Sequence, residues 1–159
     1  MSTIADDLRR TVTESSRTLL ALDEEASRRP LGGKPGQWCP REVIGHLIDS
    51  ASNNHGRFVR AQLQEDLVFD GYEQDDWVRV QRYRDVPWRE LVELWRGLNL
   101  HLAHVIDGIP AEVRTRPRRR HNLDVIAFKT VDVAQPTTLE YFLRDYVDHL
   151  RHHLASLPR

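Results

Sequence analysis

The sequence predicts an all-α protein, a bundle of four long helices. Apolar residues recur at helical spacing in four stretches, and the connections between these stretches carry prolines and glycines and lack that period. The chain has 159 residues, 40% of them hydrophobic and 30% charged. That length and balance are typical of one soluble globular domain, which we expect to span residues 1–159.

The first two helices are expected over residues 3–27 and 40–67, joined by a loop rich in glycine and proline. The second helix opens with a proline, which is favoured in a first helical turn. Cys39 and Glu42 resemble a capping box in which a cysteine takes the place of the usual hydroxyl residue.

A polar line of side chains runs along the second helix beside its apolar stripe. It consists of His46, Ser50, Asn53 and Arg57. Such a line is typical of a solvated face. In a four-helix bundle, however, a central helix has neighbours on several sides, so the line can also face an internal cavity.

Residues 73–84 are expected to form a short helix, and the third long helix follows with a continuous apolar seam over 88–106. Asn99 falls inside that seam, so it requires a hydrogen-bond partner or a polar cavity. His101 and His104 lie outside the seam and are expected at the surface.

Residues 110–136 lose the helical period. Their basic cluster consists of Arg114, Arg116, Arg118, Arg119 and Arg120. The cluster has no interleaved aromatic residues and the chain has a net charge of −1, so a solvated loop or an anion contact is favoured over nucleic-acid binding. Residues 124–133 are expected to form a short β-strand or extended segment over the mouth of the bundle.

Composition also limits the compartment and the partners. No apolar run approaches the roughly 20 residues that span a bilayer, and the first residues lack the layout of a signal peptide. The single cysteine excludes an internal disulfide and a Cys-rich zinc site, and it fits a reducing compartment. We expect a cytoplasmic protein that binds neither nucleic acid nor membrane, with a homodimer left open.

The last helix is expected over residues 137–157, where Thr137 and Glu140 match the Thr-x-x-Glu capping box. Two histidines break its apolar stripe: His149 and His153 lie four residues apart, with Cβ atoms about 5–6 Å from one another. His152, between them, points to solvent.

Two inward imidazoles at this spacing can converge on one divalent metal ion, with bonds of about 2.0–2.1 Å. The alternative is a pair of ordinary, partly buried histidines that hydrogen-bond to their neighbours. A helical pair supplies only two ligands, so a metal site requires a third from another element.

Four stretches of the sequence resemble the DinB-like (YfiT-like) family of metal-dependent enzymes. They are Trp38-Cys-Pro-Arg-Glu-Val-Ile-Gly-His46-Leu-Ile-Asp-Ser50, Tyr72-Glu-Gln-Asp-Asp-Trp77, Leu94-Trp-Arg-Gly-Leu-Asn99 and Asp145-Tyr-Val-Asp-His149-Leu-Arg-His152-His153. The resemblance covers nearly the whole chain, in order. It departs at Cys39, where the family more often has Ser or Thr, which we interpret as a changed helix cap.

The resemblance implies an up-down-down-up four-helix bundle and one divalent metal ion bound by three histidines. Matched by motif, the ligands are His46, His149 and His153, although periodicity alone would leave His46 at the surface. Zinc or nickel fits the ligand set best. Leu150 stands where a metalloprotease His-Glu-x-x-His motif would have Glu, so protease activity is not expected.

Three histidines leave an open coordination position, which is typical of catalytic sites. A hydrolase could use metal-activated water on a small-molecule substrate, and an S-transferase could use a low-molecular-weight thiol at the same position. A stress-related binding protein with a structural metal is the non-catalytic alternative. The sequence does not separate the first two or identify the substrate.

Several polar residues are candidates for a supporting role at the site. Asp145, four residues before His149, could orient an imidazole N–H. The candidates for lining the cavity are Asp49, Asn53, Arg57 and Asn99. For each of these, a surface or interhelical hydrogen bond is the alternative.

Overall fold

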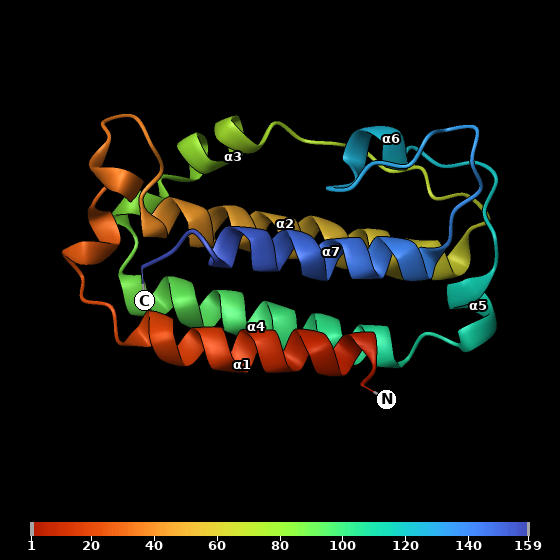
Figure 1. The fold of residues 1–159 in the computed structure, drawn as a ribbon, viewed down its shortest axis with the longest axis horizontal. Coiled ribbons are helices and arrows are strands. Elements are labelled where there is room, and N and C mark those ends of the chain that lie inside the picture. Colours follow the sequence, from red (N-terminus) through yellow and green to blue (C-terminus); the bar gives the residue numbers. More distant parts are fainter. Residues whose placement is uncertain (1, 159) are drawn as a thin grey trace.

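The structure is a computed structural model and describes residues 2–158. Its four long helices are α1 (Ile4–Leu20), α2 (Pro40–Leu63), α4 (Trp88–Asp107) and α7 (Leu139–Leu154). In Figure 1, α1 and α7 run from right to left, whereas α2 and α4 run from left to right. Helices α4 and α7 each pack against both α1 and α2. The expected all-α bundle with up-down-down-up topology is therefore confirmed.

Because α2 and α4 are parallel, the connection over residues 64–87 must return along the whole bundle. It contains α3 (Gln74–Gln81) and a 3-10 turn (Tyr83–Asp85). The short helix expected over 73–84 is thus divided in two, because Arg82 adopts a left-handed conformation with φ of 53°.

The second long connection, residues 108–138, contains α5 (Ala111–Thr115) and α6 (Leu123–Ile126). Figure 1 shows α3 and α6 on the same side of the bundle, above α2 and α7. The β-strand or extended segment expected over 124–133 is therefore wrong in its first part, which is helical. The backbone N–H of Leu123 donates to Nδ1 of His121 at 3.2 Å and so starts this short helix.

Both of the first two helices end earlier than expected, because backbone groups near their ends bind elsewhere. After α1, the Asp23 carboxylate accepts the N–H of Ala26 at 2.7 Å and starts a separate 3-10 turn. After α2, the backbone of Leu67 pairs with that of Arg120 and Asn122. The start of α2 agrees with expectation, since the N–H of Cys39 donates to Glu42 at 2.9 Å.

The N-terminus of α7 differs from the predicted cap. Thr138, not Thr137, is the N-cap residue, and its hydroxyl accepts the N–H of Tyr141 at 3.1 Å. Thr137 instead forms an isolated antiparallel bridge with Arg118, in which each backbone N–H donates to the other's carbonyl. The Thr137–Glu140 capping box is therefore wrong.

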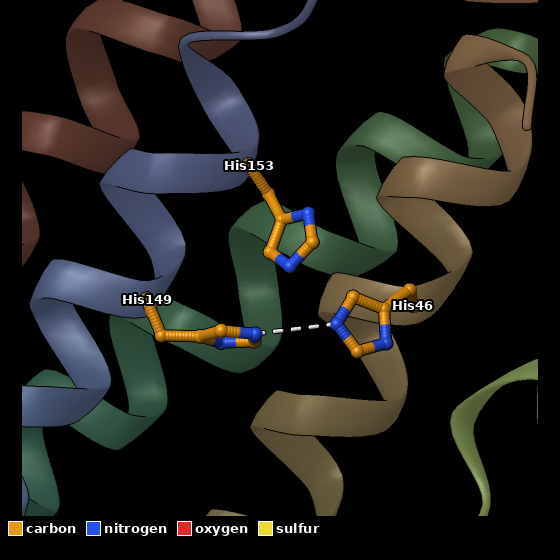
Figure 2. Close-up of side chains that lie close together, drawn as sticks. All are labelled: His46, His149 and His153. Carbon is orange, nitrogen blue, oxygen red and sulfur yellow. Dashed lines mark hydrogen bonds between the residues drawn. The ribbon is translucent and has the colours of Figure 1, made fainter. Parts of the chain in front are cut away.

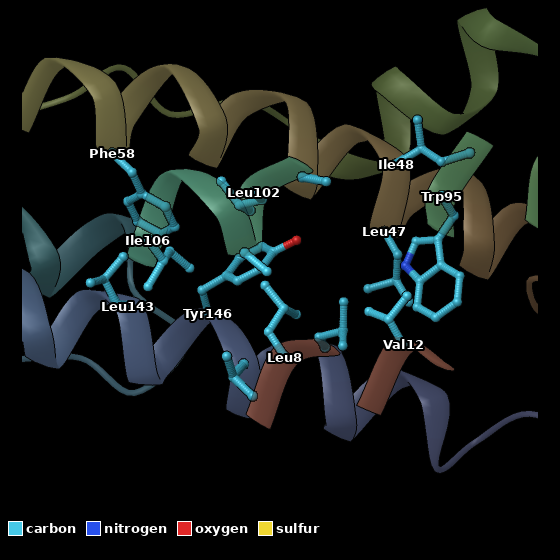
Figure 3. Packing of buried hydrophobic residues seen from close by; sticks show 14 of the residues in the cluster. Leu8, Val12, Leu47, Ile48, Phe58, Trp95, Leu102, Ile106, Leu143 and Tyr146 are labelled. Carbon is cyan, nitrogen blue, oxygen red and sulfur yellow. The ribbon is translucent and has the colours of Figure 1, made fainter. Parts of the chain in front are cut away.

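The apolar stripes of the four helices meet in one core, which Figure 3 shows around Trp95, Leu102 and Tyr146. Asn99 is buried in this core with two partners. Its amide donates to the carbonyl of Trp95 at 2.9 Å, and its Oδ1 accepts the Tyr146 hydroxyl at 2.5 Å. Of the two expectations for Asn99, the hydrogen-bond partner is correct.

The basic cluster was expected to be solvated, but one member, Arg118, is buried and only 2% exposed. Its guanidinium donates to the carbonyls of Ala61, Gln64, Glu65 and Val113. The cation thus satisfies carbonyl groups at the C-terminal end of α2, where the helix dipole also favours positive charge. The cluster also forms surface ion pairs, namely Arg114–Glu140, Arg116–Glu65 and Arg120–Asp66. Within residues 2–158, no helix combines the length and apolarity needed to cross a bilayer.

Candidate metal centre

The three histidines named from the sequence lie together in the structure. His46 on α2 faces His149 and His153 on α7, as Figure 2 shows. The Nε2 atoms of His46 and His149 are 3.3 Å apart, and one ring nitrogen from each of the three residues lies within 4.8 Å of the other two.

Helix periodicity explains the two ligands on α7. His149 and His153 are half-buried and project toward α2, whereas His152 is exposed. His46, by contrast, is only 2% exposed, and the Trp38 ring packs beside it with centroids 5.3 Å apart. The segment before α2 therefore covers an imidazole that helix periodicity alone would leave in solvent.

The arrangement fits a divalent metal ion. Tetrahedral ligand nitrogens at about 2.0–2.1 Å from a metal are about 3.3–3.4 Å from each other, which matches the separation of the His46 and His149 Nε2 atoms. A hydrogen bond between two neutral imidazoles uses the N–H of one ring and the lone pair of the other. A metal ion would use both lone pairs and leave the far ring nitrogens protonated.

Burial keeps these imidazoles in the form that binds metal. Burial, with a smaller contribution from the neighbouring histidines, lowers the pKa of His46 to about 3 and that of His149 to about 4. The pKa of His153 is lowered for the same reasons. All three rings are therefore neutral at pH 7, with lone pairs available to a cation.

A cavity of about 510 Å³ adjoins the histidines. Helix α2 contributes His46, Ser50 and Arg57 of its polar line together with Asn54, helix α7 contributes a mixed face, and the two long connections close the sides. The lining includes His46, Ser50, Asn54, Arg57, Tyr72, Glu73, Phe128, Phe142, Asp145, Tyr146 and His149. Three of the four residues of the polar line on α2 therefore face a cavity, which is the second of the two interpretations left open by the sequence.

The sequence profile of the DinB superfamily matches residues 6–157. The chain belongs to the DinB superfamily. It is 21% identical over 126 residues to a protein of Halalkalibacterium halodurans named as a candidate metal-dependent hydrolase, covering 79% of this chain and 67% of that protein. YfiT from Bacillus subtilis, described as a probable metal-dependent hydrolase with an unusual four-helix bundle topology, superimposes with a TM-score of 0.76. That match is 19% identical and covers 97% of this chain and 81% of YfiT, and it supports the fold.

Two of the supporting residues named from the sequence, Arg57 and Asp145, line the cavity of this DinB-superfamily protein. The Asp145 carboxylate accepts the backbone N–H groups of Phe128 and Lys129 at 2.8 and 2.6 Å. Both oxygens therefore hold the cavity wall in place. Among residues 2–158, no hydrogen bond is described between Asp145 and an imidazole, so this geometry does not support its expected orienting role.

The other three candidates, Asp49, Asn53 and Asn99, are not part of the cavity lining described for residues 2–158. Asp49 is buried and accepts hydrogen bonds from the Tyr83 hydroxyl at 2.6 Å and from Gln81 at 2.7 Å. Asn53 donates to the carbonyl of Asp49 on its own helix at 2.9 Å. Asp49 and Asn53 thus form structural hydrogen bonds, which was the alternative to a role in lining the cavity.

Asn54 and Tyr72 are among the polar cavity residues that were not identified from the sequence. Asn54, beside Asn53, is buried, and its amide donates to the carbonyl of Ser50 at 2.9 Å. Tyr72 comes from the irregular connection, where helical periodicity gives no signal. Burial raises the pKa of Tyr72 to about 12, and the Asp49 carboxylate contributes to the rise, so the hydroxyl stays protonated at pH 7.

Proposed function

We propose that the chain is a metal-dependent hydrolase of a small molecule, with one zinc or nickel ion held by His46, His149 and His153. The observation that carries this proposal is the convergence of three neutral imidazoles at the edge of a cavity of about 510 Å³. That volume falls in the range of about 300–1,000 Å³ that holds small-molecule ligands.

The bound metal would supply Lewis acidity and a water molecule of lowered pKa. The side chains of the chain itself would bind and orient the substrate. The protonated Tyr72 hydroxyl can donate a hydrogen bond, and Ser50 and Asn54 add a hydroxyl and an amide to the same side of the cavity. Phe142 and Tyr146, both buried, add apolar ring surface to the lining.

A second candidate function is transfer to a low-molecular-weight thiol. The length of the cavity favours it, because lining residues on α2 extend from His46 to Arg57, about 16 Å along the helix axis. A site of that length suits an elongated molecule or two reactants placed end to end. Both functions require the same three histidines.

The first test is elemental analysis of the purified, untagged protein after reconstitution with zinc or with nickel. About one metal ion per chain is expected in the wild type, and a loss is expected in His46→Ala and in His149→Ala. A surface pair needs its own control: the His55 and His101 rings are 5.2 Å apart and could hold a metal ion weakly. His101→Ala should retain the stoichiometric ion.

No metal in the reconstituted wild type would overturn the enzyme proposal and leave a helical binding protein. With metal confirmed, a panel of small esters, amides and electrophiles separates the two activities. Turnover that is independent of added thiol supports the hydrolase, whereas turnover that requires thiol supports the transferase. Loss of turnover in His149→Ala, with His152→Ala unaffected, would assign either activity to the site.

A further inference from the structure

Arg57 is a buried cation that faces the cavity and has donors to spare. Its side chain is 5% exposed, one terminal nitrogen donates to the carbonyl of Asp70 at 2.6 Å, and the other contacts Asn54 Oδ1 at 3.4 Å. A guanidinium carries five N–H donors, so these contacts leave three unused. None of the ion pairs described for residues 2–158 includes Arg57.

The other buried arginines of the described chain have more hydrogen-bond partners and lie away from this cavity. Arg41 donates to Ser27 and to two backbone carbonyls and forms an ion pair with Glu24. Arg118 donates to four carbonyls. Neither lines the cavity beside the histidines. A buried charge is costly unless it is paired. Of the three buried arginines among residues 2–158, Arg57 is the one that lines the cavity, where an external anion could pair with its charge.

The surroundings of Arg57 hold it in place. The Tyr72 ring lies beside the guanidinium, 6.0 Å from its central carbon to the ring centroid, and the carbonyl of Asp70 fixes one edge. Two carboxylates also line the cavity. Asp145 accepts two backbone N–H groups, and Glu73 is exposed. Neither neutralises Arg57.

The distance to the histidines indicates the size of the ligand. Arg57 is eleven residues after His46 on the same helix, so their Cα atoms are about 16 Å apart. Side chains on a helix lean toward its N-terminus, which brings the guanidinium back toward His46. A ligand that reaches both ends must therefore be elongated.

We propose that Arg57 binds the carboxylate of an elongated small molecule whose reacting end lies at the three histidines. This deepens the proposed function, on which the position of the reacting end depends. A carboxylate matches the planar fork of a guanidinium, which can donate two parallel hydrogen bonds to it. The carboxylate can belong to the substrate of a hydrolase or to the thiol of a transferase.

The test compares 4-phenylbutyrate with 4-phenylbutanamide, its neutral amide, by isothermal titration calorimetry on the zinc-loaded protein. The wild type should bind the acid about tenfold or more tightly than the amide. Arg57→Gln should abolish that preference, and Arg57→Lys should retain part of it. Arg60→Gln, an exposed arginine on the same helix, should behave as the wild type.

A carboxylate could instead bind the zinc ion, so the titrations are repeated with His149→Ala. A preference for the acid that persists in this variant assigns it to Arg57, even where the metal proposal fails. Equal binding of acid and amide by the wild type, no measurable binding of the acid, or a preference unchanged in Arg57→Gln would overturn the inference. If circular dichroism shows that Arg57→Gln does not fold, the Arg57→Lys titrations decide. A preference of Arg57→Lys for the acid equal to that of the wild type would then contradict the inference.

Competition with glutathione, a tripeptide thiol with two carboxylates, tests whether the carboxylate belongs to a hydrolase substrate or to the thiol of a transferase. Displacement of 4-phenylbutyrate by glutathione in the wild type, weakened in Arg57→Lys, supports a thiol as the bearer of the carboxylate. An acid preference without displacement supports the hydrolase substrate.

Discussion

The metal-free protein should lose stability as the pH falls below about 6.5. Burial lowers the pKa of His46 to about 3 and of His149 to about 4, from an ordinary value of 6.5. Between these values the unfolded chain takes up protons that the folded chain does not bind, so acid favours unfolding. The stabilising effect is complete above pH 6.5 and is lost progressively as the pH falls toward the folded pKa values.

The size of the effect follows from the two shifts. One pKa unit corresponds to about 1.4 kcal/mol, so lowering the pH from about 7.5 to about 5.5 costs a little over 1 kcal/mol for each of these histidines. Together they should remove roughly 2–3 kcal/mol from the free energy of unfolding, and the lowered pKa of His153 acts in the same direction. A domain of ordinary stability has about 5–15 kcal/mol in total.

Urea unfolding at the two pH values, with a chelator present, measures this loss. The window stays above the ordinary range of carboxyl titration, so the histidines dominate it. His149→Gln should keep about half to two thirds of the wild-type pH dependence, because His46 and His153 remain. His152→Gln, at an exposed position, should match the wild type. A wild-type free energy equal at both pH values, or one that falls equally in His149→Gln, would refute the reasoning.

Two further predictions concern packing around the bundle core. Tyr146→Phe removes the donor to Asn99 Oδ1 and leaves a buried acceptor unpaired, so urea unfolding should show a loss of about 1–3 kcal/mol; an unchanged midpoint would contradict it. Gly45→Ala would place a Cβ atom 2.1 Å from the Tyr83 ring, so thermal unfolding should show a loss of about 1–3 kcal/mol despite the better helix propensity of alanine. Gly97→Ala, with open space around the new atom, should instead gain up to about 1 kcal/mol. Equal shifts in the two glycine variants would rule out the close contact between Gly45 and Tyr83.

The long helices and the metal-site pair on α7 could be predicted because both depend on helical periodicity alone. His149 and His153 interrupt an apolar stripe, and that interruption is visible in the sequence. His46 needed the family resemblance, because its burial depends on Trp38 and on α7, neither of which periodicity places.

On α2, a helical-wheel projection is too coarse to identify every residue that lines the cavity. On a helical wheel at about 100° per residue, His46, Ser50 and Arg57 share one mean direction. Asn53 lies about 40° to one side of that direction, and Asn54 lies about 60° to the other side. A difference of about 20° does not decide which amide faces the cavity, and packing selects Asn54.

The start of α7 was mispredicted because a distant segment competes for the backbone. Thr137 and Thr138 both suit an N-cap, but the backbone of Thr137 is already paired with Arg118. Segment 124–133 is similar, since the His121 ring accepts the first backbone N–H of α6 where the alternation of residues suggested an extended chain. Neither interaction leaves a signal in the local pattern.

The placement of the histidines on α2 and α7 also affects the resistance of the protein to proteolysis. Under the proposed function, a metal ion joining His46 and His149 links positions 103 residues apart. A permanent cross-link over a loop of that length would restrict the unfolded chain by about 4–5 kcal/mol in the chain-entropy model, and a dissociable metal ion contributes part of this. Proteases cleave chains that open, so chains deprived of metal should be degraded sooner. Metal supply would then control the amount of this protein as well as its activity.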